Sequence, residues 1–109
     1  MKVPEDLDDA GSKYWRIVTR HWRLDDHQPE ILRQACRCLD LIASAEVELA
    51  KTGPIMLDRF GQQKAAPAVM VIRDYRTLFA RLVRELGLSA ATEAAERLPK
   101  LTGRYRGRD

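Results

Sequence analysis

Apolar side chains recur at three- and four-residue intervals in three stretches of the chain, residues 13–23, 27–51 and 67–86. This spacing places them on one face of an α-helix. A glycine at position 87 suits the left-handed C-cap of the third helix, and residues 89–98 are expected to form a short fourth helix. The pattern therefore predicts an all-α fold of three main helices plus a short C-terminal helix.

Polar and turn-forming residues mark the expected helix ends. Ser12 is the expected N-cap of the first helix. Asp25 or Asp26 is expected to cap the second helix, whose first turn accommodates Pro29. Gly53 and the proline after it end the second helix.

The chain has 109 residues, which is enough for one domain with a modest core. We expect residues 1–11 to be a flexible acidic leader, residues 12–98 a helical domain, and residues 99–109 a basic flexible tail. No apolar run approaches the ~18 residues that a membrane span requires, and the start lacks a signal-peptide pattern. A soluble, cytoplasmic protein without a membrane partner is therefore expected.

Residues 52–66 form a long loop between the second and third helices. Residues 55–57 are able to form a brief strand and Phe60-Gly61 a turn, but one isolated hairpin is only marginally stable in water. Loops of this length usually have a purpose. One interpretation is a loop that docks on a neighbouring subunit, and the other is a loop whose Leu57 and Phe60 plug the domain's own core.

Basic residues gather in two places, although the formal net charge is only +3. One group falls at i, i+3, i+7 and i+10 on the first helix, opposite its apolar face. The other lies in the tail. Both are candidate contacts to DNA phosphates, and both are also explained by ordinary solvation. The candidates are Lys13, Arg16, Arg20, Arg23, Lys100, Arg104, Arg106 and Arg108.

Small chains often complete their apolar surface by self-association, and the apolar stripes of this chain are wide. We therefore expect a homo-oligomer built from helices. The candidate interface residues are Trp15, Trp22, Ile31, Leu39, Ile42, Leu57, Phe60 and Phe79.

The sequence offers little for catalysis. Cys36 and Cys38 point to different sides of a helix and are expected to be buried thiols, and the two histidines are not placed to share a metal ion. Capping and solvation explain the paired carboxylates at residues 25–26 and 46–48. There is no glycine-rich phosphate loop with its lysine. We expect no enzyme activity, no metal and no cofactor.

Several landmarks occur in the order found in one family. The chain resembles the small subunit of tailed-phage DNA-packaging terminases, in the branch with a Leu-Gly-Leu-Thr-type junction near the end. It departs from the family pattern at that junction, where the chain has Ser89-Ala90-Ala91 in place of the usual Thr-Pro: the serine keeps the capping chemistry, and the proline is absent. The landmarks are Tyr14-Trp15, the Leu24 to Pro29 junction, Cys36, Lys51-Thr52-Gly53, Pro67, and Glu85-Leu86-Gly87-Leu88-Ser89.

The resemblance implies a non-catalytic component of the genome-packaging motor in the host cytoplasm. It would assemble as a ring, engage double-stranded viral DNA and regulate the large terminase subunit, which supplies the ATPase and nuclease. Two alternatives remain open: a protein-binding helical scaffold without intrinsic DNA binding, and a small helix-turn-helix regulator whose turn would be the junction before the alanine-rich fourth helix.

Overall fold

A computed structural model describes residues 1–87 together with the backbone of residues 104 and 105. The predicted fourth helix and most of the basic tail lie outside these residues. The elements are α1 (Asp9–His21), β1 (Trp22–Arg23), α2 (Gln28–Thr52), β2 (Ile55–Leu57), β3 (Gln63–Ala65), α3 (Pro67–Leu86) and β4 (Arg104–Tyr105).

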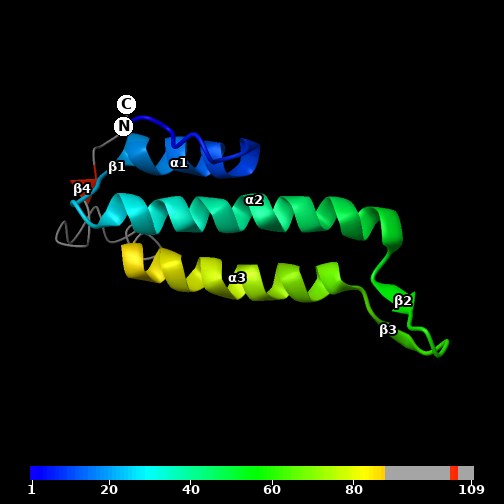
Figure 1. Cartoon of the computed structure of the whole chain (residues 1–109). Coiled ribbons are helices and arrows are strands. Elements are labelled where there is room, and N and C mark those ends of the chain that lie inside the picture. Colours follow the sequence, from blue (N-terminus) through cyan, green and yellow to red (C-terminus); the bar gives the residue numbers. More distant parts are fainter. Residues whose placement is uncertain (88–103, 106–109) are drawn as a thin grey trace.

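The three main helices are confirmed, and α2 lies between the other two (Figure 1). Helix α3 runs antiparallel to α2 along most of its length, whereas α1 covers only the N-terminal half of α2. Helix length explains this difference: α2 has 25 residues and α1 has 13, which correspond to about 38 Å and about 20 Å. The far half of α2 therefore has one helical neighbour instead of two.

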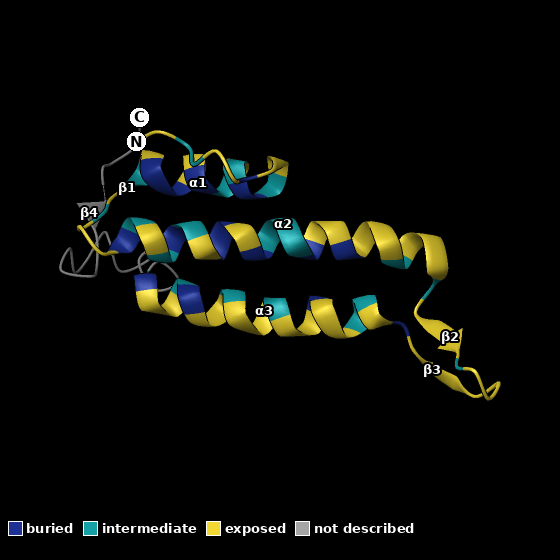
Figure 2. Ribbon diagram, viewed as in Figure 1, coloured by how far each residue is buried: buried dark blue, intermediate teal, exposed yellow. Residues whose placement is uncertain are grey.

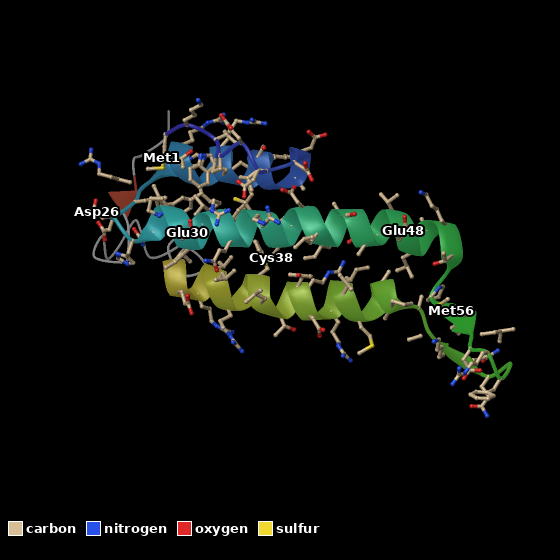
Figure 3. The ribbon with its side chains drawn as sticks, in the orientation of Figure 1. Met1, Asp26, Glu30, Cys38, Glu48 and Met56 are labelled. Atoms are coloured by element: carbon tan, nitrogen blue, oxygen red, sulfur yellow. The ribbon has the colours of Figure 1, made fainter. Side chains whose placement is uncertain are left out.

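The core is deepest where all three helices meet. Trp15 and Val18 of α1 pack with Leu32 and Cys36 of α2 and with Leu86 of α3. Two smaller clusters continue along the seam between α2 and α3, and Cys38 belongs to the first of them (Figure 3). Burial thins toward the far end of α2, which is mostly exposed (Figure 2).

Helix α1 begins earlier than the sequence indicates, and its cap comes from another helix. The carboxylate of Asp40 on α2 accepts hydrogen bonds from the backbone N–H of Asp8 (2.8 Å) and of Gly11 (2.6 Å). Ser12 lies inside the helix, so its assignment as N-cap is wrong. A carboxylate 29 residues away in sequence supplies the acceptor that a local cap normally supplies.

The segment before α1 packs on α2. Leu7 is buried in the core, and Asp6 forms ion pairs with Arg33 (2.5 Å) and Arg37 (3.1 Å) of α2. The chain therefore contacts α2 from Asp6 onward.

The start of α2 also differs from the prediction. Its N-cap position is His27, and neither Asp25 nor Asp26 caps it with a side chain. The fully buried amide of Gln28 joins the helix ends instead: its Oε1 accepts from the backbone N–H of Asp25 (2.6 Å), and its Nε2 donates to the carbonyl of Leu86 (3.4 Å). This side chain therefore ties the turn before α2 to the end of α3, without capping the first turn of α2.

The end of α3 follows the local signals closely. Its bounds match the predicted ones, and Gly87 adopts the left-handed conformation (φ 78°) with its N–H bonded to the carbonyls of Val83 and Arg84. A glycine suits this position because a side chain there is strained.

Two short antiparallel strand pairs modify the all-α expectation. In one, β1 pairs with β4; in the other, β2 and β3 form a hairpin in the loop between α2 and α3. The hairpin projects past the end of the helices (Figure 1). Leu57 is 64% exposed and Phe60 76% exposed, so the interpretation that these residues plug the domain's own core is wrong.

Candidate nucleic-acid interface

The outward face of α1 carries three basic residues. Lys13, Arg16 and Arg20 are all exposed, because Trp15 and Val18 on the opposite face are buried against α2 and α3. The three residues span about 10 Å along the helix axis at about 1.5 Å per residue. They therefore form a short, continuous strip of positive charge, which we call the α1 basic face.

The cations of this face are not neutralised within the described part of the chain. None of the three forms an ion pair with a described residue, whereas arginines and a lysine elsewhere do. The hydrogen bonds from Arg33 are strong enough to lower the pKa of Glu30 to about 2. The paired cations are Arg33, Arg37, Lys51, Arg73 and Arg76.

Arg23 does not continue the helical strip. Helix α1 ends at His21, and Arg23 lies in strand β1, where its Cα is opposite that of Arg104 in β4. The backbone pairing brings together one residue from each of the two predicted basic groups, which are 81 positions apart in the sequence. Lys100, Arg106 and Arg108 lie outside the described residues.

Helix α3 carries two exposed cations that are not among the sequence-predicted contacts. Arg81 and Arg84 on α3 are exposed and form no ion pair with any residue that the structure describes. Their neighbours Arg73 and Arg76 are paired with Asp74 (3.6 Å) and Glu46 (3.1 Å). Sequence spacing alone does not distinguish the unpaired arginines from the ion-paired ones, because the partner of Arg76 lies on another helix.

The predicted interface residues divide into two groups. The chain's own helices cover Trp15 (3% exposed) and Ile42 (8% exposed), and they partly cover most of the others. Tyr14 of α1 contacts Phe79 of α3 edge to face, with ring centroids 5.4 Å apart. Of this set, only the two hairpin residues, Leu57 and Phe60, are mostly exposed, so they are the members available to another copy.

The thiols are enclosed as expected. Burial, with a smaller contribution from the charge of Asp40, raises the pKa of Cys36 to about 12, and burial also raises the pKa of Cys38. Both thiols are therefore protonated at neutral pH, which makes them weak nucleophiles.

Among the residues that the structure describes, no group of three or more histidine, cysteine, aspartate or glutamate side chains is placed to share a metal ion. None of the described helices combines the length and apolar character needed to cross a membrane.

Among the described residues, these features define a small three-helix unit with a basic face on its shortest main helix, whose cations have no described ion-pair partner, and an apolar hairpin at one end. The model of the family "Phage terminase, small subunit" matches residues 12–100, which is most of the chain. The chain belongs to this family. No curated protein and no solved structure matches it.

Proposed function

We propose that this terminase small subunit is a non-catalytic, DNA-engaging adaptor of the genome-packaging motor. It assembles as a ring and acts with the large terminase subunit in the host cytoplasm. Family membership supports the packaging role. The observation that carries the DNA-binding part is the α1 basic face, whose cations are exposed and without ion pairs among the described residues.

Unpaired surface cations are suited to phosphates. A cation already held by a carboxylate must lose that partner before it can neutralise a phosphate, whereas Lys13, Arg16 and Arg20 have none to lose within the described residues. A helix face that contacts phosphates fixes position without reading base sequence. We therefore expect DNA binding by this face to be largely independent of sequence and strongly dependent on salt.

The size of the effect follows from counterion release. Each phosphate neutralised on B-DNA contributes about 0.9 to the slope of log K against log salt concentration, so three cations contribute about 2.7. At about 0.15 M salt this slope corresponds to about two orders of magnitude in affinity.

The test compares two triple variants with equal loss of charge. In one, Lys13, Arg16 and Arg20 are each replaced by glutamine; in the matched control, the ion-paired Lys51, Arg73 and Arg76 are replaced by glutamine. Fluorescence anisotropy with a duplex of unrelated sequence, titrated at several salt concentrations, measures the slope. We expect the first variant to lose about 2.7 from the slope and the control to change little.

Equal effects of the two variants would contradict the assignment to α1. A wild-type protein that forms a ring but does not bind DNA would favour the protein-binding scaffold instead. Its exposed apolar hairpin is the observation that supports this second function.

A further inference from the structure

The hairpin presents large apolar side chains to water. Ile55, Leu57 and Phe60 are each more than half exposed, and every described residue of β2 and β3 is exposed. An isolated hairpin is marginally stable, and contiguous exposed apolar surface usually marks an interaction site.

The tip of this hairpin is nevertheless well organised. The carboxylate of Asp58 accepts hydrogen bonds from the backbone N–H of Phe60 (2.8 Å) and of Gln62 (2.9 Å), and Gly61 has a positive φ of 80°. Arg59 lies over the ring of Phe60, 5.1 Å from its centroid. The tip therefore presents an aromatic ring and a guanidinium group together, in a defined geometry.

A matching apolar strip runs along α2. The face of α2 that packs on α1 carries Leu32 and Cys36, and the same face continues through Ala43, Val47 and Ala50. Helix α1 begins at Asp9 and does not extend over Ala43, Val47 and Ala50, so these three residues are exposed, Val47 by 56%. The first turn of α1 lies beside this strip.

Between the first turn of α1 and this strip lies a groove of about 380 Å³. It is lined by Asp8, Asp9, Ala10, Asp40, Ala43, Ser44 and Val47. Its floor is apolar and its rim is acidic. Asp40 is engaged in capping α1, whereas the side chains of Asp8 and Asp9 form no ion pair with a described residue. The groove is thus complementary to the hairpin tip in both apolar character and charge.

We propose that the hairpin tip of one copy docks in this groove of a second copy, with Phe60 against Ala43 and Val47 and Arg59 beside Asp8 and Asp9. The proposal rests on the self-assembly included in the proposed function. The donor and acceptor surfaces differ, so each copy has one of each, and such heterologous contacts generate rings when the rotation closes.

A second groove, of about 390 Å³, lies between α2 and α3, shares Ser44 with the first groove, and competes with it for the hairpin. It is lined mostly by apolar residues, including Val71, but its only acid is Glu48. Met56 from the chain's own hairpin contributes to its lining (Figure 3). It therefore matches Arg59 less well than the groove beside α1.

The first test traps the contact between copies. A Phe60→Cys chain is mixed with a Val47→Cys chain that carries a larger tag, and the mixture is oxidised. The native cysteines are buried and react slowly. We expect a mixed-tag disulfide dimer in high yield. The matched control replaces Val47→Cys with Val71→Cys, which lies in the competing groove, and we expect at least tenfold less dimer. A higher yield with Val71→Cys, or equal yields, would overturn the proposal.

The second test uses charge. Arg59→Asp and Asp9→Arg are each expected to weaken assembly at least tenfold by sedimentation, and the double variant to recover most of that loss. Additive losses would overturn the proposal.

DNA binding separates this proposal from the proposed function. Neither Arg59 nor Asp9 belongs to the α1 basic face. If rings form and bind DNA while the disulfide and the charge rescue fail, the docking proposal is wrong and the adaptor function stands. If the wild-type protein stays monomeric at all concentrations, the docking proposal and the ring both fail.

Discussion

Replacement of Asp40 by alanine tests whether α1 is capped by a distant carboxylate. The change removes the acceptor for the backbone N–H groups of Asp8 and Gly11. Asp8 is exposed, so water can replace its lost bond at little cost, but Gly11 is buried and its N–H is left without an acceptor. A hydrogen bond to a charged group contributes about 1.5–3 kcal/mol.

Because one of the two groups can be rehydrated, we expect Asp40→Ala to lower the free energy of unfolding by about 2 kcal/mol. In a domain of this size, that corresponds to a decrease of roughly 8–16 °C in Tm. The matched control is Ser12→Ala, which removes the cap that the sequence predicts but the structure does not use. We expect this change to cost less than about 0.5 kcal/mol.

Urea unfolding followed by circular dichroism, at one fixed protein concentration, measures both variants. The concentration must be fixed because self-association would add to the apparent stability. Asp40→Asn keeps one carbonyl oxygen and should fall between Asp40→Ala and the wild type. If Ser12→Ala cost about 1 kcal/mol or more and Asp40→Ala cost no more than this, the cap would be local and the described packing of α1 would be wrong.

Two further predictions concern the same region. A Cβ added at Gly11 would lie 2.5 Å from Oδ2 of Asp40 and 2.7 Å from the backbone carbonyl oxygen of Cys36. Gly11→Ala should therefore destabilise the fold by about 1–3 kcal/mol. A stabilising effect, which is usual when alanine replaces a glycine within a helix, would contradict the close approach of α1 and α2. The folded-state pKa of Cys36, about 12, lies above the ordinary value. The unfolded chain therefore releases this proton at a lower pH than the folded chain, and stability should be lost as the pH rises from about 9 toward 12. The decrease in Tm between pH 8 and pH 10.5 should be larger for the wild type than for Cys36→Ala, and equal decreases would show that the thiol titrates normally.

Local patterns are sufficient to predict where the three main helices lie in the sequence and which side of each helix is apolar. The bounds of α3 and the left-handed Gly87 follow from apolar spacing and from the conformational freedom of glycine, which are properties of neighbouring residues. The same spacing correctly places Lys13, Arg16 and Arg20 on an exposed face. It does so because the large apolar residues on the opposite side of that helix must be buried, whatever they pack against.

The errors at the helix ends occur where a partner lies far along the chain. The capping carboxylate of Asp40, the bridging amide of Gln28 and the pairing of Arg23 with Arg104 join positions separated by 29 to 81 residues. Helical spacing has a period of only a few residues, so it contains no information about which distant group will arrive beside a helix end. A nearby serine or aspartate satisfies the local capping pattern, but neither Ser12 nor Asp25 or Asp26 caps a helix here.

The candidate site shows the same division. Residue type and spacing identify which side chains are cationic and outward-facing, because charge and helical phase belong to each residue and its neighbours. Which cations remain unpaired depends on how α2 and α3 align, since this alignment brings Glu46 to Arg76 and leaves Arg84 without a described partner. The exposed end of the α2 strip has the same origin: α1 is shorter than the helix on which it packs, and its position on α2 is set by contacts at Asp40 and Gly11.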